Sequence, residues 1–404
     1  MLGLDGGVAM GSRGSEREGS SKNVVWLGLV SLFTDISSEM TFSILPTFFY
    51  EQLRIPRALI GLIEGVAEAA SYVFRMLSGL ISDRIGRRKA VVFAGYAFSN
   101  VVKPLFAFAS TWVDALAIRF SDRVGKGVRT APRDALLASS VSERRVGRAF
   151  GLHRTLDQSG AVIGPFLALL LVPLITARGV FLASFIPGLL ALLILVFFVQ
   201  ERASRPQGAK LLGNVGQVLQ GRFPLLLAVV SLFSIGAFDF SFVLLAARDW
   251  GVPEALIPGV YLALNVAHAA LGIPAGITAD RIGRERALLL GYSAFAATSL
   301  ALVVLDANPF NAFVVALAYG VYMGIVETVQ RAVIPRYAPE GLRGTAYGVY
   351  YLTVGVSFLA ANFIVGFLWD AAGRRAAFTY SLVTSLVAAA ALLYFTVARK
   401  LRVP

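Results

Sequence analysis

A short basic loop occurs twice in this chain, and each copy joins two long apolar runs. The first copy spans Gly79–Lys89 (GLISDRIGRRK), and the second spans Gly276–Arg286 (GITADRIGRER), 197 residues later. A repeat at this distance predicts a protein built of two similar halves. Membrane proteins built in this way are usually transporters.

The apolar runs are long enough to cross a membrane. Apolar residue types make up 57% of the 404 residues and charged types only 15%, whereas soluble domains have roughly 25% charged residues. A chain of this length can form about twelve membrane helices of roughly 20 residues each. We expect an all-α membrane protein with spans at 23–50, 57–82, 88–111, 113–137, 147–172, 178–199, 223–247, 256–279, 285–305, 310–335, 343–369 and 375–398.

Basic residues predict the orientation of these spans, because cytoplasmic loops are rich in Lys and Arg. They follow every second span on one side, although Arg54, Arg57, Arg374 and Arg375 lie on the other side. Both termini are then cytoplasmic, and the plasma membrane is the expected location. The basic residues on the cytoplasmic side are Arg84, Arg87, Arg88, Lys89, Arg144, Arg145, Arg148, Arg281, Arg284, Arg286, Arg399, Lys400 and Arg402.

The same distribution explains the net charge of +13 without nucleic acid as a partner. The expected organisation is a disordered cytoplasmic tail (1–22), a six-helix bundle (23–199), a cytoplasmic linker (200–222), a second six-helix bundle (223–398) and a short tail (399–404). We expect a monomer in contact with membrane lipid.

Several classes of protein are excluded by residues that the chain lacks. It has no cysteine and only two histidines, so neither a disulfide framework nor a thiolate or histidine-rich metal site is expected. There is no phosphate-binding loop, no metal-binding helix motif and no nucleophile elbow. The sequence therefore predicts no cofactor, no resident metal and no enzyme activity, and an ion gradient rather than ATP as the energy source.

Three motifs resemble the major facilitator superfamily, and specifically its drug/proton antiporter branch. The loop Gly79–Lys89 resembles the family's loop signature between the second and third helices. The span 147–172 has the spacing G-x8-G-x3-G-P of the antiporter branch, although Ala168 replaces an expected glycine. The segment Arg123–Gly127 is similar to an R-x-x-Q-G element, with Lys126 in place of Gln. The residues of the antiporter motif are Gly151, Gly160, Gly164 and Pro165.

This resemblance implies a transporter that works by alternating access between two halves. It implies a central cavity lined by the first, fourth, seventh and tenth helices, and a small-molecule substrate. The antiporter motif implies export driven by protons as the coupling ion.

The loop signature predicts a conformational latch. Gly79 and Gly86 permit close backbone approach and a tight turn. The resemblance places Asp83 at the positive end of the helix that starts near Gly344. Arg87 or Arg88 could pair with an acid at the end of the span 113–137, and Asp134 is the candidate. Alternatively, the basic residues serve only topology.

Charged residues within the spans are the main candidates for function, since each costs roughly 2.5–3.5 kcal/mol at the bilayer centre. They either form an internal network of ion pairs or exchange protons. Several pairs are four residues apart and so share a helix face. The candidates for proton coupling or substrate binding are Asp35, Glu39, Glu64, Glu68, Arg123, Lys126, Asp239, Glu327 and Arg331.

Asp239 is the most specific of these candidates, because no charged residue lies near it in the span 223–247. The repeat places it opposite Glu39 of the first half. We expect Glu39 and Asp239, with Asp35 nearby, to bind the proton or a cationic substrate. Aromatic residues in the spans suit small amphipathic or cationic cargo.

Three other interpretations stay open. Arg119, Arg123, Lys126 and Arg129 could instead bind an organic anion. Asp35, Glu39 and Asp239 could bind a divalent metal as cargo. The chain could also be a membrane receptor or an assembly subunit that transports nothing, since a fold does not fix a function.

Overall fold

The computed structural model describes residues 9–85, 87–142, 145–201, 215–338 and 342–400, and these residues form helices and connecting turns with no strand. The first half contains α1 (Ala9–Phe42), α2 (Leu45–Thr47), η1 (Phe48–Gln52), α3 (Arg57–Ile85), α4 (Arg88–Val102), η2 (Lys103–Phe108), α5 (Trp112–Ser139), α6 (Val146–Ala183) and α7 (Phe185–Phe197). The second half contains α8 (Val215–Val218), α9 (Phe223–Ser234), α10 (Phe240–Asp249), η4 (Glu254–Leu256), α11 (Ile257–Ile282), α12 (Arg284–Val304), α13 (Pro309–Val333), η5 (Ile334–Arg336), α14 (Arg343–Ala372) and α15 (Arg374–Lys400).

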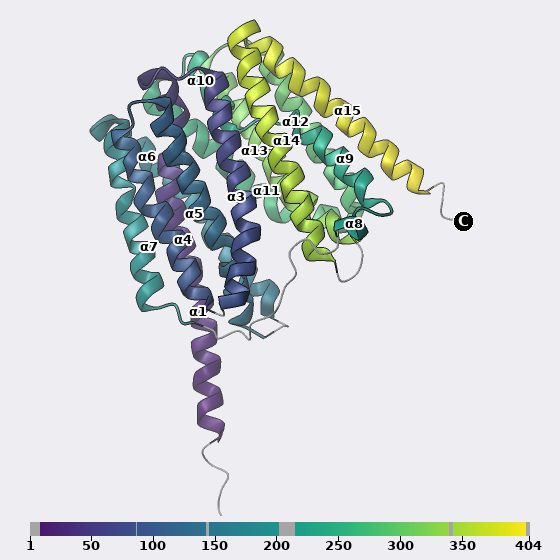
Figure 1. Ribbon diagram of the computed structural model, residues 1–404. Coiled ribbons are helices and arrows are strands. Elements are labelled where there is room, and N and C mark those ends of the chain that lie inside the picture. The colour runs from purple at the N-terminus through teal and green to yellow at the C-terminus, as the bar shows by residue number, and fades with distance from the viewer. Residues whose placement is uncertain (1–8, 86, 143–144, 202–214, 339–341, 401–404) are drawn as a thin grey trace, which may run out of the picture.

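The two halves stand side by side as bundles of long helices (Figure 1). Helix α7 ends and α9 begins toward the lower end of the view, here called the linker end, and α1 projects beyond the bundle there. The upper end, where η1 leads into α3 and α10 leads into α11, is called the opposite end. The ribbons of the two halves come together at the opposite end and diverge toward the linker end.

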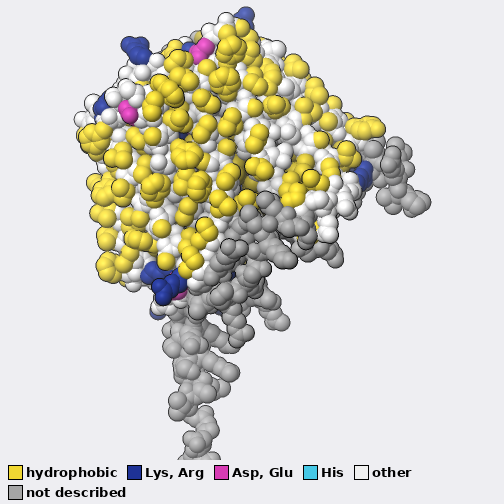
Figure 2. Space-filling view, in the orientation of Figure 1, with side chains coloured by type: hydrophobic (Ala, Val, Ile, Leu, Met, Phe, Trp, Pro, Cys, Tyr) yellow, Lys and Arg dark blue, Asp and Glu magenta, His cyan; other side chains and the backbone are white. Residues whose placement is uncertain are grey.

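On the face shown in Figure 2, hydrophobic side chains predominate, and the visible Lys and Arg lie near the two ends of the bundle. Large apolar side chains of the bundle are exposed, among them Leu174 (76% exposed), Ile273 (74%) and Tyr394 (77%). By length and composition, seven helices of the described residues could cross a membrane. Others that were expected to cross, such as α3 and α5, carry interior charges. This surface is suited to lipid rather than water.

Two of the expected spans are broken near the opposite end, so the predictions of continuous helices at 23–50 and 223–247 were wrong. The first span leaves α-helical geometry after Phe42 and continues as α2 and the π-helix η1. The second stops at Ser234 and restarts at Phe240. Hydrogen bonds from the Tyr380 and Tyr319 hydroxyls satisfy the carbonyls of Ile235 (2.7 Å) and Phe238 (2.6 Å) within that break. These bonds matter because lipid offers no partner for a free carbonyl.

Three further boundaries differ from expectation. The stretch labelled α6 runs to Ala183, but its non-helical Thr176 (φ 61°, ψ 171°) breaks it between the spans expected at 147–172 and 178–199, while α6 and α7 are separated only at Ser184. The span expected at 88–111 changes to a 3-10 helix at Lys103, next to Pro104, which lacks a backbone donor. The first helix starts at Ala9, inside the segment expected to be a disordered tail.

The repeated loop makes a similar contact in each half, although from different positions of the repeat. Arg88 donates to the carbonyl of Ala135 (3.4 Å), and Arg284, the counterpart of Arg87, donates to the carbonyl of Ala332 (2.7 Å), so the two acceptors are 197 positions apart. Gly283 has φ 94° at the turn between α11 and α12. That backbone conformation favours glycine.

Candidate functional site

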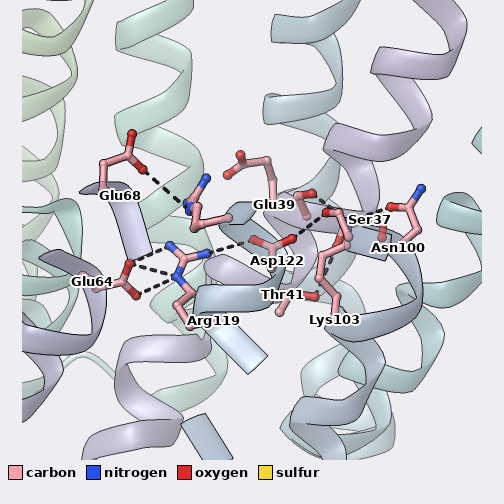
Figure 3. A network of polar contacts seen from close by, with 12 residues as sticks. Ser37, Glu39, Thr41, Glu64, Glu68, Asn100, Lys103, Arg119 and Asp122 are labelled. Carbon is pink, nitrogen blue, oxygen red and sulfur yellow. Dashed lines mark hydrogen bonds and ion pairs between the residues drawn. The ribbon is translucent and has the colours of Figure 1, made fainter. Parts of the chain in front are cut away.

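A buried ion pair joins α3 to α5 inside the first half. Arg119 donates from Nε and Nη2 to both carboxylate oxygens of Glu64, at 2.6–3.1 Å. Its Nη1 lies 3.6 Å from Asp122, one turn further along α5. All three side chains are buried. Forked contacts of this kind fix both partners, so Arg119 and Glu64 tie the two helices together (Figure 3).

A second pair lies one turn nearer the linker end. Arg123 Nε lies 3.7 Å from Glu68. The ring of Phe42 at the end of α1 lies under both arginines, 4.0 Å from Arg119 and 4.9 Å from Arg123. Cations stack favourably on such a face. The stripe of charges on α5 therefore packs against α3 through carboxylates and against α1 through an aromatic ring.

Lys103 is fully buried where α4 gives way to η2. Its Nζ donates to Ser38 of α1 (2.7 Å) and to the side-chain oxygen of Asn100 (2.9 Å). Ser99, in the preceding turn, donates to Asp122 (2.6 Å). The first half therefore contains a polar network that reaches from α3 through α5 and α4 to α1 (Figure 3).

Two acids on α1 lie where the antiporter-motif glycines bring α6 against it. A Cβ on Gly160 would lie 2.9 Å from that of Asp35, and a Cβ on Gly164 would lie 2.9 Å from that of Glu39. Both positions would also clash with the backbone of α1, at 2.5 and 2.8 Å. These two glycines therefore set the distance between α6 and the acids. Gly151 has no atom within 4 Å of such a Cβ, so it does not share this role.

Glu39 and Asp35 have different neighbours. Glu39 accepts a hydrogen bond of 2.6 Å from Tyr261 of α11, in the second half. Asp35 lies within hydrogen-bonding reach of Asp157 on α6. Asp157 also accepts from Ser31 (2.6 Å) and Arg154 (2.9 Å).

Asp239 does not lie within a helix, contrary to the sequence prediction. It follows the break in the seventh span and is the N-cap of α10, where its carboxylate accepts from the backbone (2.9 Å) and hydroxyl (2.6 Å) of Ser241. Its own backbone N–H donates to Asn362 of α14 (2.8 Å). The carboxylate also interacts electrostatically with Glu64 and Arg119 of the first half.

Glu327 of α13 lies among three cationic or titratable side chains. Its Oε2 is 3.6 Å from Arg154 of α6, 3.6 Å from His268 of α11 and 3.7 Å from Arg331. Arg154 belongs to the first half, so this cluster crosses between the halves. The predicted neighbours Glu327 and Arg331 are therefore together, and the structure adds two partners to them.

The structure separates the predicted site residues into two groups. Glu64, Glu68, Arg123, Glu327 and Arg331 take part in ion pairs. Within the described part of the chain, the remaining candidates have no ion pair within 4.0 Å, and these are Asp35, Glu39, Lys126 and Asp239.

The predicted latch can be described only in part. Gly79 faces Ala131 of α5, where a Cβ would lie 3.4 Å from that of Ala131. Arg87 is the N-cap residue of α4, and Asp134 pairs with its neighbour Arg133 (2.8 Å). Gly86 and the side chain of Asp83 lie outside the described residues.

A set of contacts between the halves closes the opposite end. Arg57, at the start of α3, lies 2.7 Å from Asp249 and 3.8 Å from Asp370 of the second half. The rings of Tyr50 and Trp369 lie 4.1 and 4.8 Å from its guanidinium. Glu51 pairs with Arg248, and Gln52 donates to Glu254 (3.4 Å).

Helices α3 and α14 also approach each other most closely at the opposite end. A Cβ on Gly61 would lie 2.1 Å from the Asn362 carbonyl oxygen, whereas toward the linker end a Cβ on Gly348 would lie 3.3 Å from Met76.

Sequence reasoning did not select several residues that the structure brings into the site. Arg154 and Asp157 are three apart on one helix, and that spacing was a usable signal. Tyr261 and Arg57 gave none, because their partners lie in the other half of the chain.

Metal cargo is not supported by the geometry. Among the described residues, no three His, Cys, Asp or Glu side chains converge in a way that could hold a metal ion. Asp35, Glu39 and Asp239 therefore do not form the site that a divalent cation requires. The anion interpretation also loses support, because Arg119 and Arg123 pair with acids and Arg129 is buried against the Tyr96 ring at 4.5 Å.

Comparison with known proteins agrees with this architecture. The chain is 32% identical over 383 residues to an uncharacterized MFS-type transporter of Methanocaldococcus jannaschii, covering 93% of this chain and 95% of the relative. It is 25% identical over 282 residues to the multi-drug resistance efflux pump PmrA of Streptococcus pneumoniae, covering 66% of this chain and 69% of that pump.

Solved structures share the fold at low sequence identity. The nucleoside transporter NupG superposes with a TM-score of 0.73 at 12% identity, over 93% of this chain and 98% of that one. A bacterial homolog of the human lysosomal transporter Spinster gives 0.72 at 14% identity, over 92% and 96%. These likenesses confirm the predicted fold class of two helical bundles in a membrane.

The family model described as Major Facilitator Superfamily matches residues 27–222 and 224–404, which is nearly the whole chain. Together with the doubled loop, the helical fold and the apolar outer face, this match confirms the resemblance seen in the sequence motifs. It also agrees with the prediction of a transporter rather than an enzyme. The chain belongs to the Major Facilitator Superfamily.

Proposed function

We propose that this protein is a secondary active transporter that couples proton entry to the export of small amphipathic or cationic compounds. Alternating access would come from movement of residues 23–199 against residues 223–398, joined by the cytoplasmic linker 200–222. The basic residues of the linker end support a cytoplasmic location for that end and for both termini. The proposed setting is the plasma membrane, with the protein as a lipid-embedded monomer.

One observation carries the assignment of the coupling site. Three of the candidate acids, Asp35, Glu39 and Asp239, have no ion pair among the described residues and come from the first and seventh spans, and Glu39 and Asp239 interact with the opposite half. An acid without a cationic partner can gain or lose a proton without breaking an ion pair. A positively charged substrate could supply the missing partner. We assign proton binding and recognition of cationic cargo to these three residues.

The antiporter motif supports the direction of transport. Gly160 and Gly164 place α6 directly behind Asp35 and Glu39, so a glycine motif typical of antiporters borders the proposed proton site. The similarity to a multi-drug resistance efflux pump supports export and a broad range of cargo. We also propose that the residues from Gly79 to Arg88, with Asp134, form a conformational latch at the linker end, because this loop resembles the family's loop signature.

Asp239 offers a sharp test, because its charge and its capping role can be separated. Asp239→Asn keeps an oxygen that can accept from Ser241 but removes the charge, whereas Asp239→Ala removes both. The protein would be placed in liposomes, and an imposed pH gradient would be used to drive accumulation of ethidium. We expect Asp239→Asn and Glu39→Gln to abolish pH-driven accumulation while both proteins stay folded.

Proton-coupled export would be contradicted if the Asp239→Asn protein accumulated ethidium fully and independently of pH. Accumulation of organic anions in place of cations would instead support the anion interpretation, with Lys126 as the unpaired cation. Binding of many compounds with no flux of any of them would support a receptor or assembly role.

A further inference from the structure

The guanidinium of Arg154 lies between two carboxylates, one from each half, that compete for it. Its Nη1 lies 2.9 Å from Asp157, on its own helix, and its Nη2 lies 3.6 Å from Glu327 of α13. The first distance is that of a hydrogen bond and the second is longer than one. Arg154 is therefore held by its own half and only approaches the other half.

The surroundings leave Arg154 free to change partner. Its side chain is 53% exposed, so no packing fixes it. Glu327 is also held loosely, because His268 and Arg331 lie 3.6 and 3.7 Å from the same oxygen. A small shift of α13 toward α6 would convert the long contact with Arg154 into a hydrogen bond.

The partner in the first half belongs to the acids near the proposed proton site. Asp157 accepts from Ser31 and lies within hydrogen-bonding reach of Asp35. Neutralising Asp157 would therefore remove the stronger of the two attractions on Arg154. The charged or titratable groups that interact with Asp157 are Asp35 of α1, Arg133 of α5, His153 and Arg154 of α6, and His268 of α11.

The rest of the interface between the halves agrees with a state that is more open at the linker end. The closest approach of α3 and α14 and the Arg57 contacts all lie at the opposite end. Glu327 lies in the part of α13 that leads to the linker end, whereas Pro309 begins that helix at the opposite end. A tighter bond between Arg154 and Glu327 would thus draw the linker end together.

We propose that Arg154 is a switch that exchanges Asp157 for Glu327 when its bond with Asp157 is weakened, and that this exchange favours closure of the linker end. The inference depends on the proposed proton coupling for its physiological meaning. The conformational exchange itself needs no substrate. It identifies Arg154 as a positioning residue that links the acids of the first half to the second half.

The test measures opening of the linker end directly. The chain contains no cysteine, so spin labels can be attached at Ser139→Cys, at the end of α5, and at Arg286→Cys, at the start of α12. Both positions are exposed. Distances between the labels would be measured by pulsed electron spin resonance in lipid nanodiscs, with no substrate present.

The expected shifts have opposite signs. Asp157→Asn should move the population toward shorter distances, and Glu327→Gln should move it toward longer ones. Each should change the population ratio by about two- to five-fold, the size typical of partly exposed ion pairs. In an Arg154→Gln background, Asp157→Asn should have no effect. Arg148→Gln, on the same helix, is the matched control and should leave the distances unchanged.

Two results would overturn the switch. One is a shift in the same direction for Asp157→Asn and Glu327→Gln, and the other is an Asp157→Asn shift that persists without Arg154. If the Asp157→Asn protein does not fold, Glu327→Gln is tested in the Arg154→Gln background. The switch predicts that Glu327→Gln then adds no shift beyond that of Arg154→Gln alone. Failure of ethidium transport with intact distance shifts would contradict the proposed function and leave the switch standing.

Discussion

Tyr261 of the second half donates a hydrogen bond of 2.6 Å to Glu39 of the first half, and so connects the two halves at an acidic residue. The bond reaches an acid that has no ion pair within the described part of the chain, so the hydroxyl is its closest polar partner from the other half. Tyr261 also packs against Phe240 of α10, with ring centroids 4.7 Å apart. A change in the charge of Glu39 would therefore directly affect Tyr261 of α11 and, through the ring contact of Tyr261, α10.

Removal of this hydroxyl should impair transport without unfolding the protein. A hydrogen bond to a charged group contributes about 1.5–3 kcal/mol, and a loss at the lower end of that range corresponds to about tenfold in rate. We expect Tyr261→Phe to lower the initial rate of ethidium transport in liposomes by about that factor. Tyr394→Phe, on the exposed surface of α15, is the control and should transport normally. A Tyr261→Phe protein with full activity would exclude a functional role for this bond.

The pair Arg119–Glu64 should be the most costly contact to break in the first half. Removing one partner leaves the other charge buried and unpaired, at a cost of about 3–5 kcal/mol. We expect Glu64→Gln and Arg119→Met each to lower the thermal unfolding temperature in detergent. The double variant, with both charges removed, should be more stable than either single one, and additive losses would show that the two residues do not act as a pair.

The glycines of the antiporter motif should respond unequally to alanine. Gly160→Ala and Gly164→Ala add a Cβ within 3 Å of α1, so they should push α6 away from Asp35 and Glu39 and reduce transport strongly. Gly151→Ala meets open space and should be neutral or stabilise the helix by up to about 1 kcal/mol. Transport rates and unfolding temperatures of the three variants check this order. Equal effects at all three positions would contradict the packing argument.

Loss of Arg57 should weaken closure of the opposite end. This residue contacts Asp249 and Asp370 of the other half, together with two aromatic rings. We expect a cysteine introduced at Val260, buried on α11, to react faster with a water-soluble maleimide when Arg57 is replaced by alanine. Arg375→Ala removes an exposed arginine from the same end and is the matched control. An unchanged labelling rate in the Arg57→Ala protein would show that the other contacts suffice to keep the opposite end closed.

The sequence predicted the fold well because the features that define it are local. Long apolar runs, a loop repeated at a fixed distance and basic residues near the span ends each depend on neighbouring residues only. The breaks at Phe42 and Ser234 were missed. At the second break, the carbonyls of Ile235 and Phe238 are satisfied by Tyr380 and Tyr319 of distant helices, which no local pattern reveals.

The arrangement of the candidate residues could be predicted only where their spacing along one helix determines it. Spacing along a helix grouped Glu327 with Arg331, and the structure brings them to 3.7 Å. It could not tell that Glu64 and Glu68 pair with arginines while Asp35 and Glu39 do not, because pairing depends on how α3, α5 and α1 pack. Asp239 was selected as an isolated acid of a continuous helix, but its place at a helix start depends on the break that precedes it.

The break before Asp239 bears on how fast this protein can change state. Bending a continuous helix requires main-chain hydrogen bonds to be lost in a medium that offers no replacement. Between Ser234 and Phe240 that ladder is already interrupted, and the short helix α10 packs on the still shorter α2 of the first half. We therefore expect side-chain contacts, rather than the helix backbone, to set the activation barrier for opening this end. Single substitutions at those contacts can thus tune the turnover rate of the carrier.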